Sequence, residues 1–119
     1  MEGFLGGLFT VLTWPYVLFF PLGSFLGMLV GSIPGISTSM AIALLAPLTF
    51  FMDPVPGIIL LFSVYVSSTH AGSVSGTLIG TPGTPPAAAT LLDGFPLSKK
   101  GYPRKALQID LYSSVVGGL

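Results

Sequence analysis

Two long stretches without formal charge are the feature that most constrains this chain. Only Tyr16 among residues 3–52, and only Tyr65 and His70 among residues 54–92, carry ionisable side chains. Charged residues make up 7% of the whole chain, whereas soluble domains carry about 25%. So few charges cannot cover a water-facing surface, and the hydrocarbon core of a bilayer excludes charge. The sequence therefore predicts an all-α integral membrane protein in contact with lipid.

Prolines and glycines divide the apolar sequence into segments of one membrane domain, residues 1–119. We expect three to four transmembrane or re-entrant helical segments, at about residues 4–33, 36–52, 58–79 and 106–119. Trp14-Pro15 and Pro21 are predicted to kink the first segment or to divide an interfacial stretch from the span proper, and Pro47 to interrupt the second segment. The last segment has 14 residues, too few to cross a bilayer as a helix. The sequence is therefore expected to be the N-terminal part of a longer membrane protein.

Small residues recur every four positions in the first segment. Gly23, Gly27, Gly31 and Gly35 would form one stripe on a helix, which lets a second helix approach closely. We interpret the stripe as a helix-packing surface, with Gly23, Gly27 and Gly31 as its members within the helix.

Two breaks interrupt the apolar sequence. The first is Pro34-Gly35, followed by Ser37-Thr38-Ser39, and the second is the uncharged run from Gly80 to Pro86. Lipid tolerates a broken backbone only where protein or a polar cavity satisfies its hydrogen-bonding groups. Such breaks bind solutes and ions in secondary transporters, although Gly and Pro also mark ordinary surface turns.

Both breaks precede a predicted helix start with hydroxyl groups near its N-terminus. A hydroxyl cap and free backbone N–H groups there would make an uncharged cradle for a carboxylate. We therefore predict a substrate- or ion-binding site, with Ser73 as a secondary candidate. Its other residues are Gly35, Ser37, Thr38, Thr81, Pro82, Gly83 and Thr84.

His70 lies in the serine- and threonine-rich half of the third segment. An ionisable group within a membrane suggests a function, here a polar relay. The alternative is a neutral histidine that hydrogen-bonds between helices. Both interpretations stay open at this stage.

Enzymatic and nucleic-acid-binding functions find little support in the residues. The chain has one histidine, no cysteine and a net charge of zero, so we expect no catalytic residues, no metal site and no nucleic-acid partner. The glycine-rich run from Gly76 to Gly83 lacks the Gly-Lys-Ser/Thr ending of a phosphate-binding loop.

All four basic residues fall in one predicted loop, residues 93–105. By the positive-inside rule this loop is cytoplasmic. We therefore assign its basic residues to membrane topology rather than to binding; they are Lys99, Lys100, Arg104 and Lys105.

Several of these motifs together resemble the TctA family, the large membrane subunit of tripartite tricarboxylate transporters. The resemblance covers roughly residues 23–119. It rests on the sequences Gly27–Gly35 and Ala46–Phe50, on Gly72-Ser73, and on Gly80–Pro85 followed by Ala88–Gly101.

The resemblance implies a multi-pass permease of the bacterial inner membrane, built as a larger inverted-repeat bundle. Such permeases work with a small membrane subunit and a periplasmic solute-binding protein. They import citrate or other small carboxylates, driven by a sodium or proton gradient, and need no other cofactor. This chain would be the N-terminal part of one half.

The chain also departs from the family pattern around the predicted site. Ser67-Ser68 stands where glycines are usual, His70 where Tyr is common, Ala71 in place of Gly, and Gly80 in place of Asn; Asp110 falls in a normally apolar stretch. These departures imply either a different substrate or a truncated, non-transporting protein. In the second case the chain would act only as a helix-packing and interaction module.

Overall fold

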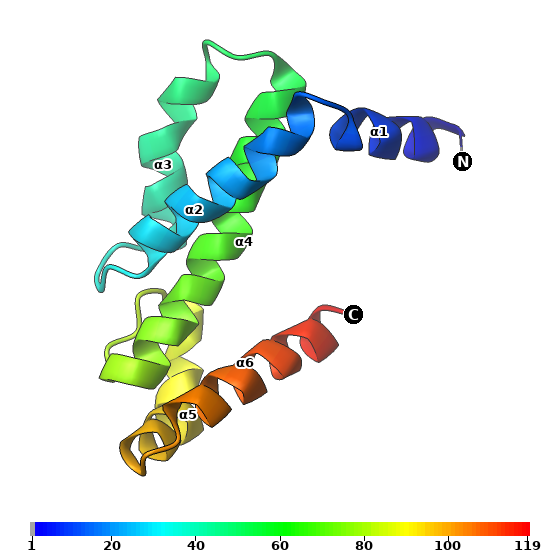
Figure 1. Cartoon of the computed structure of the whole chain (residues 1–119). Coiled ribbons are helices and arrows are strands. Elements are labelled where there is room, and N and C mark those ends of the chain that lie inside the picture. The colour runs from blue at the N-terminus through cyan, green and yellow to red at the C-terminus, as the bar shows by residue number, and fades with distance from the viewer. Residues whose placement is uncertain (1) are drawn as a thin grey trace.

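The structure is a computed structural model that describes residues 2–119. Within that range every regular element is helical. The molecule is elongated, measuring 48 × 31 × 19 Å along its principal axes (Figure 1). The elements are α1 (Glu2–Leu12), η1 (Tyr16–Leu18), α2 (Phe19–Gly31), α3 (Thr38–Thr49), α4 (Pro54–Ile79), η2 (Pro85–Ala89), α5 (Thr90–Lys99) and α6 (Pro103–Gly118).

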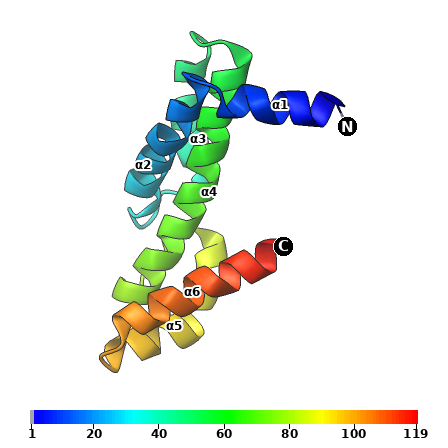
Figure 2. The ribbon, with the colours of Figure 1, turned by 45° about the vertical axis from the view of Figure 1, so that its right-hand side comes forward.

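Helix α4 is the long central helix against which the other helices pack. Its 26 residues extend over about 39 Å at 1.5 Å per residue, and it is long and apolar enough to cross a membrane. Helices α2 and α3 pack beside its N-terminal half, while η2, α5 and α6 lie by its C-terminal half (Figures 1 and 2). Helix α4 therefore connects two groups of helices, one at each of its halves.

The first apolar segment forms two helices rather than one. Helix α1 meets the η1–α2 helix at a bend of 70°, and together the pair has the length and composition of a second span. The break lies at residues 13–15, as predicted from Trp14-Pro15, because Pro15 has no backbone N–H to donate. Pro21 does not interrupt the helix. Pro21 is the third residue of α2, where a backbone N–H has no partner within the helix.

The glycine stripe packs α2 against α4. Gly23, Gly27 and Gly31 are all buried. A Cβ atom on Gly23 would lie 2.7 Å from the Leu60 carbonyl oxygen, and one on Gly27 would lie 2.7 Å from that of Val64. The two backbones are thus in direct contact.

Prolines interrupt the later helices less than predicted. Pro47 lies inside α3, which continues to Thr49. Pro96 lies inside α5, so residues 93–99 are helical and the predicted loop 93–105 shrinks to residues 100–102. Tertiary contacts override the weak helix propensity here, because Gly94 packs on Thr77 and Phe95 covers Gly80.

A tight turn joins α5 to α6. Gly101 adopts φ +96°, its N–H bonds to the Ser98 carbonyl, and the Tyr102 N–H bonds to the Leu97 carbonyl. This is the Schellman arrangement that ends many helices at a glycine. The turn brings α6 back alongside α5 (Figure 2).

Candidate functional site

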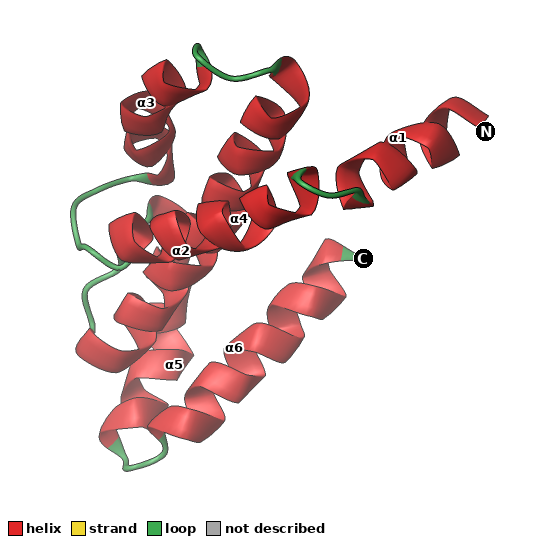
Figure 3. Ribbon diagram, turned by 45° about the horizontal axis from the view of Figure 1, so that its top comes forward, coloured by secondary structure: helices red, strands yellow, loops and turns green. Residues whose placement is uncertain are grey.

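The two predicted breaks lie side by side. The α2–α3 loop and the α4–η2 loop approach each other beside α4 (Figures 1 and 3). Between them lies an open cavity of about 270 Å³, which Gly35 and Ser37 line from the first break. The second break contributes Pro82, Gly83, Thr84 and Pro85. Residues almost fifty positions apart in the sequence thus form one pocket.

The first break provides a hydroxyl at the start of a helix. Ser37 is the N-cap of α3, and its Oγ accepts a hydrogen bond from the Met40 backbone N–H at 3.2 Å. Because that oxygen acts as an acceptor, its own proton remains able to donate to a ligand. Gly35, with φ +93° and open space around its Cα, makes the sharp turn that precedes this cap. It therefore does not extend the glycine stripe.

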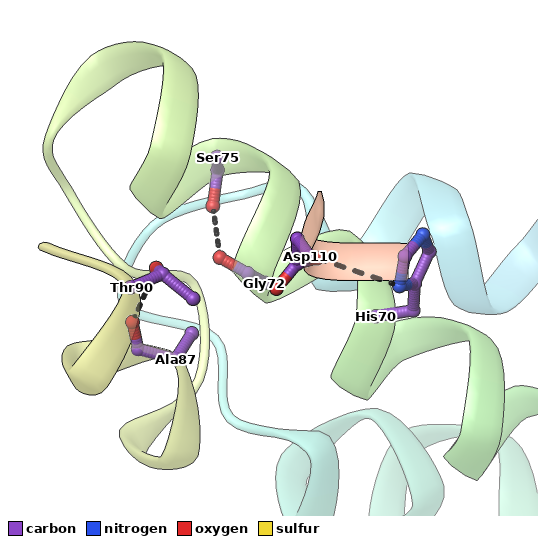
Figure 4. A network of polar contacts seen from close by, with 6 residues as sticks. All are labelled: His70, Gly72, Ser75, Ala87, Thr90 and Asp110. Atoms are coloured by element: carbon purple, nitrogen blue, oxygen red, sulfur yellow. Dashed lines mark hydrogen bonds and ion pairs between the residues drawn. The ribbon is translucent and has the colours of Figure 1, made fainter. Parts of the chain in front are cut away.

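The second break is tied to α4 through Ser75. The Gly83 N–H donates to Ser75 Oγ at 3.1 Å, and the Ser75 hydroxyl donates to the Gly72 carbonyl at 2.9 Å (Figure 4). A Cβ on Gly83 would collide with the Gly31 carbonyl oxygen and lie 3.1 Å from the Gly72 Cα. The missing side chains of Gly83 and Gly72 thus let the break fit between α4 and the end of α2.

Thr84 does not cap the second helix start as predicted. It is 2% exposed and makes no capping hydrogen bond, because Pro85 and Pro86 have no N–H to offer and the Ala87 N–H bonds to the Thr84 carbonyl. Its Oγ1 faces Gly72 instead and has no hydrogen-bond partner. The element that follows the second break, η2, is also only a five-residue 3₁₀ helix.

A second cavity of about 190 Å³ adjoins the first and shares Ser37 and Pro85 with it. Thr38, a predicted site residue, lines it and lies 3.4 Å from Thr69, oxygen to oxygen. Ser39, Tyr65 and Thr69 were not predicted for this site. Tyr65 and Thr69 are four residues apart and lie on one face of α4. Their spacing in the sequence is the signal that could have grouped them.

The remaining predicted residues lie elsewhere. Ser73 is half-buried on α4 and Thr81 is exposed, and neither lines the cavity between the breaks. His70 lines neither of these two cavities, and its Nδ1 lies 3.9 Å from Asp110 Oδ2 (Figure 4). This pair connects α4 to α6.

Of the basic residues, Arg104 lines a cavity of about 290 Å³ together with His70, and the Lys99 ammonium lies 5.0 Å from the centre of the Phe95 ring. Within residues 2–119 no three His, Cys, Asp or Glu side chains are grouped so as to hold a metal ion.

Comparison with known proteins gives two matches. The sequence profile of the family described as "Tripartite tricarboxylate transporter TctA family" matches residues 17–119. An uncharacterized 52.8 kDa protein from the TAR-I ttuC′ 3′ region of Agrobacterium vitis is 36% identical over 112 residues. That alignment covers 94% of this chain and 22% of the relative, so the chain spans about a fifth of the relative's length. No solved structure matches.

Proposed function

Because the chain belongs to the tripartite tricarboxylate transporter TctA family, whose members are membrane components of transporters, we propose that it forms part of a permease for small carboxylates. The permease lies in the bacterial inner membrane. It works with a small membrane subunit and a periplasmic solute-binding protein, and a sodium or proton gradient drives import.

The cavity between the two breaks supports this proposal most directly. Its lining is uncharged, it lies where two helical segments are interrupted, and it includes the hydroxyl that caps α3. Broken helices present backbone N–H groups and helix N-termini to anionic substrates in secondary transporters. The N-terminus of α3 carries a partial positive charge that favours a carboxylate.

We assign distinct roles to the residues of this site. The Ser37 hydroxyl donates to a substrate carboxylate, and Thr38 extends the polar surface toward Thr69 in the adjoining cavity. Gly35, Pro82 and Gly83 shape the walls. Thr84 contributes its backbone, since its hydroxyl faces Gly72. Thr81 and Ser73 lie outside the cavity and take no part in substrate contact.

The alternative, a non-transporting packing module, has less support. That interpretation needs a glycine stripe available to a partner. Gly23, Gly27 and Gly31 are instead buried against α4 of the same chain, so the stripe contributes to the internal packing of this fold.

Uptake by a reconstituted system tests the proposal. The permease that contains this chain is placed in proteoliposomes with its small subunit and binding protein, and radiolabelled citrate and smaller carboxylates are supplied. We expect accumulation of at least one carboxylate under an imposed sodium or proton gradient, and none without a gradient. Absence of gradient-driven uptake for all of them would contradict the proposed function.

A further inference from the structure

Helix α1 extends away from the rest of the fold. None of its residues is buried, and its two phenylalanines, Phe4 and Phe9, are 75% and 69% exposed. In both ribbon views it runs sideways from the end of the molecule where α4 begins (Figures 1 and 2). Apolar surface left uncovered on this scale marks contact with a partner or a membrane.

The register of α2 against α4 fixes the height at which α1 leaves the fold. Gly23 contacts Leu60, and eight residues later Gly31 contacts Ser68, so the two helices run in the same direction. Extended back by seven residues, this register places η1 beside the exposed Asp53, where α4 begins. The basic residues lie in or beside the α5–α6 turn, by the other half of α4. Helix α1 therefore leaves α4 at the surface opposite the basic turn.

The direction and length of α1 do not suit a crossing of the bilayer. The 70° bend turns it away from the η1–α2 helix, which packs along α4. Its 11 residues extend over about 16 Å, about half the thickness of the hydrocarbon core. Trp14 lies in the break between the two helices and is 72% exposed. Tryptophan is enriched where hydrocarbon meets the lipid headgroups.

The side chains of α1 are sorted by size around the helix. At 3.6 residues per turn, one side carries only small residues, which are Gly3, Gly6, Gly7 and Thr10. The other side carries only bulky apolar residues, which are Phe4, Leu5, Leu8, Phe9, Val11 and Leu12.

The small side of α1 needs no protein partner. The Thr10 hydroxyl donates to the Gly6 carbonyl of its own helix at 2.8 Å. A Cβ on Gly3, Gly6 or Gly7 would meet nothing within 4 Å, so no helix within residues 2–119 is seated on the glycines. The bulky side is therefore the part of α1 that calls for an apolar environment.

We infer that α1 is an interfacial helix, which lies in the plane of the membrane at the surface opposite the basic turn. Its bulky side enters the acyl-chain region and its small side faces the headgroups, an arrangement that suits a helix with one apolar face. Because α1 carries no basic residue, its partner is the acyl chains rather than anionic headgroups. The inference requires a membrane-embedded permease, and it does not depend on which solute the permease carries.

Spin labels on single cysteines measure the depth of α1 in proteoliposomes. The chain has no cysteine, so Leu5→Cys, Leu12→Cys and Thr10→Cys are each introduced into the permease that contains it, with cysteines elsewhere replaced. Phe51→Cys, at a 93% exposed position in the α3–α4 turn, is the aqueous reference. Depth follows from the collision rates of each label with oxygen, which enters the hydrocarbon, and with a nickel chelate, which stays in water.

Leu5 and Leu12 lie on the same side of α1, two turns and about 10 Å apart along its axis. We expect their labels at similar depths in the acyl-chain region, and the Thr10 label shallower by roughly 5–10 Å, the scale of the helix diameter. If either leucine variant does not fold, Phe4→Cys and Val11→Cys, which have the same spacing and share the bulky side, decide.

Three results would overturn the inference. A depth difference of about 10 Å between the Leu5 and Leu12 labels would make α1 part of a membrane span. Labels on both sides of α1 that neither reagent reaches would place it against the remainder of the permease, and nickel access to all of them would place it in water. Carboxylate uptake by the same proteoliposomes in any of these cases would retain the proposed function. The expected depths without uptake would reject the proposed function alone.

Discussion

The backbone N–H of Gly83 donates a hydrogen bond to the hydroxyl of Ser75, eight residues earlier in the chain, at 3.1 Å. The same hydroxyl donates to the Gly72 carbonyl at 2.9 Å. The buried Ser75 hydroxyl and a longer backbone bond from the Gly83 N–H to the Gly72 carbonyl, at 3.4 Å, therefore fix the second break to α4 at the point where α2 ends. The shape of the cavity between the breaks depends on this contact.

Ser75→Ala is expected to loosen the second break. It removes the Ser75 acceptor of the buried Gly83 N–H, which keeps only its longer 3.4 Å bond to the Gly72 carbonyl, so we expect a loss of about 0.5–1.5 kcal/mol, the net worth of one hydrogen bond. Thermal or denaturant unfolding of the permease in detergent measures the loss. Ser67→Ala is the matched control on the same helix, because the Ser67 hydroxyl donates only to the Ser63 carbonyl one turn earlier. Equal stability of the two variants would contradict the role given to Ser75.

Gly27→Ala is expected to separate α2 from α4. The added Cβ would lie 2.7 Å from the Val64 carbonyl oxygen and 2.9 Å from the Ser67 Cβ, and forcing extra volume into packed contacts costs about 1–3 kcal/mol. Gly7→Ala is the control on α1, where the new methyl meets nothing within 4 Å. It should stabilise the helix by about 0.5–1 kcal/mol. Unfolding of both variants tests the pair, and a Gly27→Ala protein as stable as Gly7→Ala would contradict direct backbone packing.

Much of this fold follows from local sequence patterns. The four-residue spacing of Gly23, Gly27 and Gly31 predicts a helix surface suited to close packing, and the structure places it against α4. The Ser37 cap also follows from sequence, because a hydroxyl after Pro34-Gly35 satisfies the first N–H groups of the next helix.

Other features depend on contacts that no local pattern reveals. Helix α5 forms despite Gly94 and Pro96, because its packing on Thr77 and Gly80 outweighs propensity. The approach of His70 to Asp110 joins positions 40 residues apart. Thr84 differs from both cases. Its failure to cap was deducible, since two prolines follow it and neither has an N–H.

The turn between α5 and α6 is expected to face the cytoplasm. All four basic residues lie in or beside it, and basic loops stay on the cytoplasmic side. The chain contains no cysteine, so Tyr102→Cys adds a single thiol to this segment, at an exposed position. A membrane-impermeant maleimide should label it in inside-out vesicles and not in intact cells stripped of their outer membrane.

Phe51→Cys is the matched control for this topology. Phe51 is 93% exposed and lies in the α3–α4 turn, at the opposite end of α4 (Figure 1). It should show the reverse labelling, from outside only. Labelling of both thiols from the same side would contradict the assignment of α4 as a membrane span.

The central claim, that the cavity between the two breaks receives a substrate carboxylate, makes Ser37 its most informative residue. Asp and Asn both cap helices about as well as Ser, so Ser37→Asp and Ser37→Asn should preserve α3. Asp would place a negative charge in a cavity that is otherwise uncharged. Repulsion between like charges would then oppose binding of an anionic substrate.

The most direct test is the initial rate of gradient-driven uptake of radiolabelled citrate, or of whichever carboxylate the wild-type permease accumulates, normalised to the amount of folded protein. We predict that Ser37→Asp lowers this rate at least about tenfold, equivalent to about 1.4 kcal/mol, while Ser37→Asn retains most of it. Equal uptake by Ser37→Asp and the wild type would contradict the account.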